Sequence, residues 1–175
     1  VTSDTWSKDQ DFGDIPSPSE TGYTPNHTTV SNKGIGHDHK DITEKVIYSP
    51  DAQKASVTYI DDTTHQTLSQ KELTGKSNEN SGYTTGSTIT DYKNKGYDFV
   101  SDNTNGKEIV FDTDDQTDQN YVVHLKHGTT TVTPEKPGQP GQPINPQDPK
   151  GPKYPNGTDK EGLTHKVNRT INYVN

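Results

Sequence analysis

The apolar residues of this chain occur only in short alternating runs, which limits what it can fold into. In residues 55–60 and 119–125, Val and Tyr alternate with polar residues, as in strands with one buried face. Clusters of Gly, Asn, Asp and Ser between the runs indicate turns. We therefore expect a mostly β (α+β) chain with at most one short helix, at 69–73 or 87–95. The other strand candidates are 42–48, 97–100, 107–111 and 166–174, and Gly75, Gly82 and Gly96 are expected at turns.

The apolar content is too low for one large core. Only 22% of the 175 residues are hydrophobic and the mean hydropathy is −1.17, whereas globular domains carry roughly 45–50% apolar residues, Gly included. We expect small modules instead. The absence of Cys excludes thiolate chemistry and zinc–thiolate sites.

Charge and hydropathy exclude further partners. The net charge of −8 argues against nucleic acid and anionic lipid, which both require basic patches. No run approaches the ~20 apolar residues of a membrane span, so we expect no membrane insertion. The first residues show no signal-peptide pattern, and we expect a segment of a longer protein, with signal peptide and anchor outside it.

Internal repetition suggests how the chain is divided. Residues 170–175 echo 56–61, and Gly22-Tyr23 echoes Gly96-Tyr97. Residues 134–155 hold most of the Pro and cannot enter a sheet interior, so we expect an extended polyproline-II-like spacer. The expected parts are the C-terminal part of a first module (1–50), a complete module (51–128), a Pro/Gly-rich spacer (129–162) and the opening strand of a next module (163–175).

Several short motifs follow one another in an order found in a known family. They are Val57-Thr-Tyr-Ile-Asp61, Leu73-Thr-Gly75, Gly82-Tyr83-Thr84, Gly96-Tyr-Asp-Phe-Val100, Gly106 and Tyr121-Val-Val-His-Leu125. The chain resembles the MucBP-domain repeats of mucus-binding (Mub-type) adhesins, cell-surface proteins of lactobacilli and related gut bacteria. One departure is the turn after Asp61, where the family tends to have Asp-x-x-Gly and residues 61–64 contain no Gly.

This resemblance implies both a fold and a function. It implies two small β-grasp (ubiquitin-like) modules in an elongated tandem-repeat arrangement, on a secreted, cell-wall-anchored bacterial surface protein. It implies binding of mucin glycoproteins or their glycans through weak multivalent contacts, beside neighbouring repeats of the same protein. Two alternatives stay open: a structural stalk module without its own ligand, and an immunoglobulin-binding module.

The acidic residues provide only weak metal candidates. An acidic turn contains Asp112, Asp114, Asp115 and Asp118, but it lacks the Gly and terminal Glu of an EF-hand loop. His37 and His39 are spaced like ligands within an exposed loop. We therefore expect no metal and no cofactor, with Ca²⁺ at the acidic turn as the alternative.

Aromatic residues are the better candidates for ligand contact. No nucleophile elbow or phosphate loop is present, so we expect no catalytic residues and no enzymatic activity. Nine Tyr and one Trp could stack on sugar rings, but Tyr59, Tyr97 and Tyr121 fall at strand positions typical of a core. The candidates without such a position are Trp6, Tyr83, Tyr92 and Tyr154.

Overall fold

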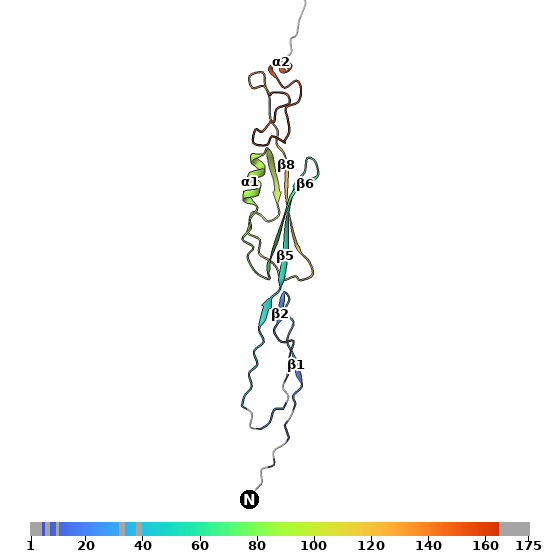
Figure 1. The fold of residues 1–175 in the computed structure, drawn as a ribbon, viewed down its shortest axis with the longest axis vertical. Helices are drawn as coiled ribbons and strands as arrows, with labels where there is room; N and C mark the ends of the chain where they lie inside the picture. Colours follow the sequence, from blue (N-terminus) through green and yellow to red (C-terminus); the bar gives the residue numbers. More distant parts are fainter. Residues whose placement is uncertain (1–4, 6–7, 10, 32–33, 38–39, 165–175) are drawn as a thin grey trace, which may run out of the picture. The chain divides into compact units, whose positions relative to one another are not determined.

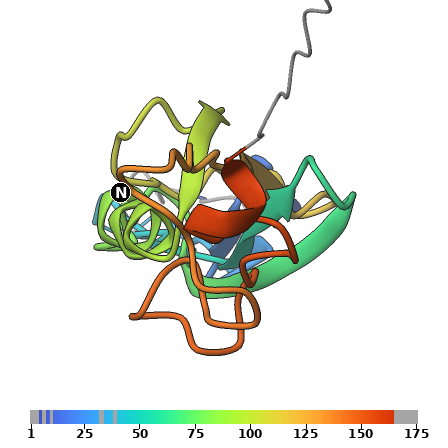
Figure 2. The same ribbon diagram turned by 90° about the horizontal axis from the view of Figure 1, so that it is seen from above.

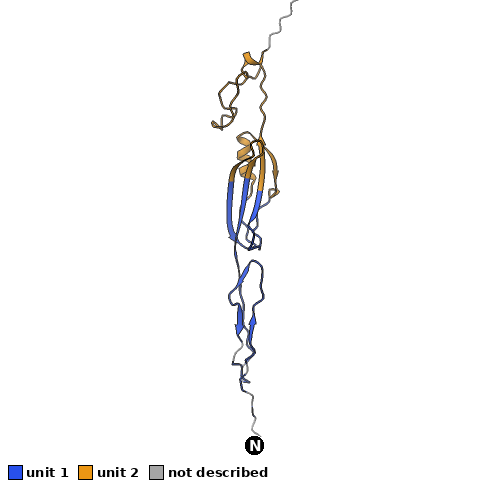
Figure 3. Ribbon diagram, turned by 90° about the vertical axis from the view of Figure 1, so that its right-hand side faces the viewer, with its two compact units in different colours: residues 1–58, 70–83, 107–121 blue, residues 59–69, 84–106, 122–175 orange. Residues whose placement is uncertain are grey.

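The computed structural model describes residues 5, 8–9, 11–31, 34–37 and 40–164 (Figure 1). Trp6, His39 and the expected opening strand at 166–174 lie outside these residues. The chain divides into two compact units (Figure 3): unit 1 comprises 1–58, 70–83 and 107–121, and unit 2 comprises 59–69, 84–106 and 122–175. The structure is mostly β, as expected, and its described part contains two short helices, of which only the first was expected. No helix in the described part is long and apolar enough to cross a membrane.

A four-stranded sheet contains most of the strand residues. Its members are β5 (Ala52–Asp61), β6 (Gln66–Lys76), β7 (Tyr97–Asp102) and β8 (Gln119–His127), in the order β6-β5-β8-β7. The Ser56 hydroxyl bonds the Asn120 side chain at 2.8 Å, and Asp62 N donates to Leu125 O at 2.7 Å. These contacts advance together along β5 and β8, as in a parallel pair. β7 and β8 are antiparallel, with a register shift between Phe99 and Ser101.

Unit 1 also contains two small antiparallel sheets. β1 (Asp14–Pro16) pairs with β3 (Thr29–Ser31), and β2 (Tyr23–Pro25) pairs with β4 (Tyr48–Pro50). The strand expected over 42–48 is wrong except for Tyr48, because the residues before it make no ladder. The buried apolar residues of unit 1 are Ala55, Val57, Leu73, Ile109 and Phe111.

The expected strand at 107–111 is also wrong, although apolar residues in this segment do alternate between buried and exposed positions. Ile109 and Phe111 are buried while Val110 is 48% exposed, but Val110 forms only an isolated bridge with Asn80. The amide groups of Ile109 and Phe111 donate to Tyr83 O and Glu79 O. The segment therefore inserts alternate side chains without joining a ladder of the sheet.

The three expected turn glycines differ in their roles. Gly96 lies in a turn with φ +99°, and Gly82 also has a positive φ, +69°, a conformation that favours glycine. Gly75 is within β6 instead, so its expected turn is wrong. A Cβ at Gly75 would lie 2.3 Å from Cε2 of Phe111, so glycine is required there for close approach of the ring.

Unit 2 contains the longer of the two described helices. α1 (Gly86–Asn94) lies beside β7 (Figures 1 and 2), where the sequence placed a helix at 87–95. The alternative helix at 69–73 is wrong because pairing within β6 overrides the local propensity of those residues. Fully buried Thr85 donates its hydroxyl to the Asp102 carboxylate at 2.5 Å, which links the start of α1 to the end of β7.

The turn after β5 forms without glycine. The Asp61 carboxylate accepts hydrogen bonds from Thr63 N and the Thr64 hydroxyl, both at 2.9 Å, which is an Asx-type turn. His65 adopts φ +59°. Histidine therefore occupies the left-handed position that a glycine would fill more easily.

The Pro-rich segment is folded back, so the expected extended spacer is wrong. Its main chain closes on itself in residues 138–158, here called the spacer loop: Gly138 N donates to Thr158 O, Gly141 N to Tyr154 O and Ile144 N to Pro152 O, at 2.8 to 2.9 Å. The glycines between the prolines supply the amide donors that proline lacks. The short helix α2 (Lys160–Leu163) follows, with Asp159 as its N-cap.

We predict that Gly75→Ala destabilises the protein by about 1–3 kcal/mol, because the added methyl group overlaps the buried Phe111 ring. Gly86→Ala is the matched control, since a Cβ there meets nothing within 4 Å. The free energy of unfolding, measured with urea, checks both variants. Equal stability of the two variants would contradict the close approach of Gly75 to Phe111.

Candidate functional site

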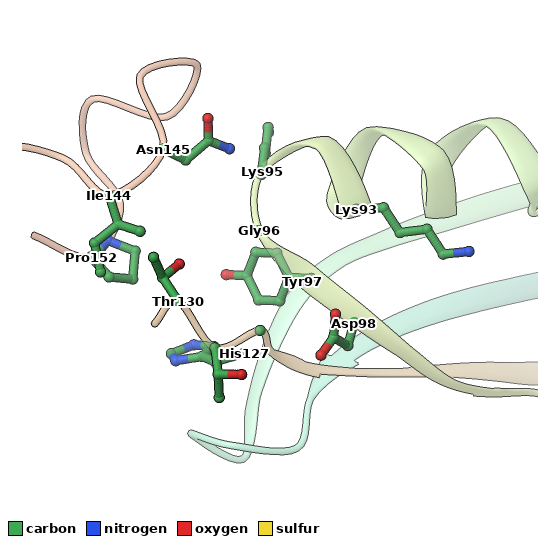
Figure 4. Close-up of a pocket in the computed structure, with 12 residues that line it drawn as sticks. Lys93, Lys95, Gly96, Tyr97, Asp98, His127, Thr130, Ile144, Asn145 and Pro152 are labelled. Carbon is green, nitrogen blue, oxygen red and sulfur yellow. The ribbon is translucent and has the colours of Figure 1, made fainter. Parts of the chain in front are cut away.

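A pocket of about 300 Å³ lies in unit 2, at the end of the sheet next to the spacer loop (Figure 4). One wall comes from the end of α1 and the start of β7, residues 93–98. The second comes from the end of β8, residues 127–130, and the third from the spacer loop through Ile144, Asn145 and Pro152. Tyr97 and His127 are direct partners in the β7–β8 register, which brings the first two walls together.

Four aromatic rings lead from the core to this pocket, and we call them the aromatic ladder. The ring centroids of Tyr59 and Tyr92 are 5.7 Å apart, those of Tyr92 and Tyr97 5.6 Å, and those of Tyr97 and His127 5.6 Å. The last two pairs are edge-to-face, a favourable aromatic geometry. Tyr59 is 1% exposed, and the Tyr92 hydroxyl hydrogen-bonds that of Ser69 at 2.6 Å. The inner end of the ladder is therefore anchored in the core.

Asp61 holds the outer end of the ladder. Its side chain is 3% exposed, and its Oδ2 lies 2.7 Å from Nε2 of His127. Burial acts to raise the pKa of Asp61, but hydrogen bonds from Thr64 and Thr63 and the charge of His127 outweigh burial, so the pKa lies below its ordinary value. An ionised carboxylate only accepts hydrogen bonds, so His127 donates through Nε2.

The Tyr97 hydroxyl points into the pocket (Figure 4). Burial, then the negative charges of Asp61 and Asp148, and then Tyr92 raise its pKa, so the phenol stays protonated at neutral pH. Among the described residues, no group hydrogen-bonds this hydroxyl. It is therefore available to a ligand as both donor and acceptor.

The lysines near the pocket lie beside aromatic rings. Nζ of Lys93 is 5.7 Å from the centroid of the Phe99 ring, and Nζ of Lys95 is 5.8 Å from that of Tyr92, within the usual range of cation–π contacts. Figure 4 shows the Lys93 side chain directed away from the pocket. Lys93, Lys95 and Asp98 all belong to the lining, so charges of both signs border the pocket.

Asn145 holds the spacer loop against the end of α1. Its Nδ2 donates to Asn94 O, and its Oδ1 accepts from Gln147 N at 2.9 Å. The loop wall is thus positioned by hydrogen bonds as well as by its own turns.

Tyr83, Tyr92 and Tyr154, three of the aromatic candidates proposed from the sequence, do not line this pocket. Tyr92 supports it through Tyr97, and Tyr154 packs in the spacer loop, where a Cβ at Gly138 would lie 2.3 Å from its ring. Tyr83 belongs to unit 1, with Nζ of Lys71 6.0 Å from its ring centroid. Trp6 is outside the described residues. Whether any of the four contacts a ligand stays a prediction.

Sequence reasoning missed Tyr97 as a site residue because a strand position was interpreted as core, whereas Tyr97 is only half-buried. It also missed His127 and Asn145. His127 follows the expected strand 119–125, and only the observed β7–β8 register shows that it pairs with Tyr97.

Three carboxylates of the acidic turn accept hydrogen bonds from protein groups. In unit 1, Asp115 accepts from Gly22 N at 3.1 Å and from Nε2 of Gln53 at 2.7 Å. Asp112 and Asp114 accept from amide groups two residues ahead, and the Asp118 main-chain oxygen accepts from the Asn120 side chain. Within the described ranges, no three His, Asp or Glu side chains are grouped to hold a metal.

We predict that Asp61→Asn lowers stability at pH 7 by about 1–3 kcal/mol, since a buried charge-assisted network is broken. The depressed pKa means that the wild-type contribution is present above pH 3.8 and lost as pH falls through the lower folded value. The variant should therefore lose less stability than wild type between pH 5 and pH 2. Asp62→Asn is the control, because Asp62 forms a more exposed pair with His124. Parallel acid-unfolding curves for wild type and Asp61→Asn would refute this assignment.

Comparison with known proteins gives two family matches. The model of a mucin binding domain matches residues 53–127, and that of a Muc B2-like domain matches residues 1–52. No curated protein matches the chain significantly.

Two solved structures are also similar. The type 2 repeat of the mucus binding protein MUB from Lactobacillus reuteri is 38% identical, covering 49% of this chain and 46% of that chain, with a TM-score of 0.44. Mub-RV is 38% identical, covering 50% and 46%, with a TM-score of 0.41. The chain thus matches less than half the length of either structure. The Muc B2-like and mucin-binding models match residues 1–52 and 53–127 in succession, so the expected resemblance to Mub-type mucus-binding repeats is confirmed.

Proposed function

We propose that this chain is a repeat of a bacterial cell-surface adhesin that binds mucus glycoproteins through their glycans. The observation that carries the proposal is the match of a mucin binding domain to residues 53–127. Such a repeat acts by binding and carries out no reaction. Its place is the outside of the cell, on a secreted, wall-anchored Gram-positive surface protein.

The proposal extends to the module and its arrangement. The sheet order is β6-β5-β8-β7, with β5 and β8 at the centre, and α1 follows β6 and precedes β7 along the chain. This arrangement supports a β-grasp description of residues 51–128. We infer that neighbouring repeats lie in tandem with this one. Weak contacts at each repeat then add up, because tethered sites bind at high effective concentration.

We predict saturable binding of the 175-residue chain to immobilised mucin and little binding to the same mucin after enzymatic removal of its glycans. Surface plasmon resonance with one copy and with two tethered copies measures both affinity and avidity. Tethering should tighten binding by roughly 10²–10⁴ if both sites engage together.

Two other results would redirect the assignment. Binding to immunoglobulin that free sugars do not inhibit would favour an immunoglobulin-binding module. No binding to mucin, glycans or immunoglobulin would favour a stalk.

We further predict that mucin binding survives a chelator, because the proposed contacts involve no metal. The same surface plasmon resonance assay is repeated in EDTA and in added Ca²⁺. Loss of binding in EDTA, restored by Ca²⁺ but not by Mg²⁺, would contradict this expectation and favour a Ca²⁺ site at residues 112–118.

A further inference from the structure

The pocket in unit 2 has two unlike sides. Ile144 and Pro152 provide apolar surface on the side of the spacer loop, and the Tyr97 hydroxyl faces them from the start of β7 (Figure 4). Thr130 lies between them and adds a second hydroxyl. A sugar ring has a matching character, with C–H faces and a rim of hydroxyl groups. Pockets of this kind, mainly apolar with a few placed polar groups, are typical of small-ligand sites.

Tyr97 is held in place before any ligand binds. Its ring makes edge-to-face contacts with Tyr92 and His127, and Asp61 fixes His127 through a 2.7 Å contact. A hydroxyl on a ring fixed in this way loses little freedom on binding, so its hydrogen bond to a ligand is used efficiently.

The local charges favour an uncharged ligand. Asp98 lines the pocket, and the charges of Asp61 and Asp148 act on Tyr97. The ammonium groups of Lys93 and Lys95 lie beside the Phe99 and Tyr92 rings. An anionic sugar in the pocket would therefore be repelled by these carboxylates, while both ammonium groups already contact aromatic rings.

We propose that this pocket is a glycan subsite that takes one terminal neutral sugar, with Tyr97 as its hydrogen-bonding group and the spacer loop as its apolar wall. The proposal deepens the mucin-binding function proposed above and rests on it.

In this proposal, the choice of sugar depends in part on the spacer loop, which lies outside the matched mucin binding domain. The mucin-binding match ends at residue 127, whereas Ile144, Asn145 and Pro152 come from the spacer loop. Repeats that share the domain but differ in this loop would then differ in the sugar they accept.

The test is an NMR titration of the isotope-labelled 175-residue chain with three probes. Methyl β-galactoside and methyl N-acetyl-β-glucosaminide are neutral, and methyl β-glucuronide is the anionic control. At least one neutral probe should shift the amide signals of Gly96, Tyr97 and Gly128. Methyl β-glucuronide should bind more weakly.

Three variants locate the contact. Tyr97→Phe keeps the ring and removes only the hydroxyl, so it should weaken neutral-sugar binding about three- to tenfold with little change in melting temperature. Tyr23→Phe, in unit 1 and outside the pocket lining, is the matched control and should bind as wild type does. Asn145→Ala releases the loop from Asn94 O and should weaken sugar binding while the amide signals of β5 stay in place.

Mucin binding is measured on the same variants, which separates the two proposals. If mucin binds but Tyr97→Phe has no effect and no neutral probe shifts Tyr97, the subsite is overturned and the adhesin function stands. If neutral sugars titrate the pocket but mucin does not bind, the subsite stands and the adhesin function fails. Tighter binding of methyl β-glucuronide would overturn the assignment of a neutral ligand.

Discussion

The contact between Asp61 and His127 holds together the functional end of unit 2. One carboxylate accepts from Thr63 N and the Thr64 hydroxyl, closing the turn after β5, and from Nε2 of His127 at the end of β8. A carboxylate that is 3% exposed requires several donors to remain ionised. Because these donors come from two places, Asp61 joins the turn after β5 to the end of β8. The aromatic ladder extends this connection to α1 and β7. The pocket therefore lies where hydrogen bonds and ring contacts hold several elements of unit 2 together.

The alternation of apolar and polar residues predicted two strands of the sheet correctly. Where it missed a strand or predicted one wrongly, the reason is physical. Residues 55–60 and 119–125 lie in β5 and β8. β6 was missed because Leu73 is its one buried apolar residue, as fits a strand at the end of the sheet order. Residues 107–111 show the opposite error, since burial of alternate side chains does not require ladder pairing. Periodicity reports which side chains are buried, while the hydrogen-bond partners depend on distant segments.

The candidate site was less predictable than the fold. Tyrosines at strand positions were assigned to the core, and ligand candidates were sought among the others. Tyr59 fits that assignment at 1% exposure. Tyr97 begins its strand where the sheet ends, so its ring is partly covered while its hydroxyl reaches the pocket. One residue thus serves packing and recognition together, a combination that a sequence pattern cannot separate without strand register.

The spacer loop shows why composition alone misled. Proline content predicted an extended segment, but alternating glycines change what the backbone can do. Gly138 and Gly141 donate main-chain hydrogen bonds that prolines cannot, and Gly141 adopts φ +82°. Gly138 also has no side chain to keep the Tyr154 ring away. Folding back places Ile144 and Pro152 at the pocket, which an extended chain would carry away from it. A segment whose composition suggests a passive linker can therefore change the recognition surface of the domain before it, with no substitution in the domain itself.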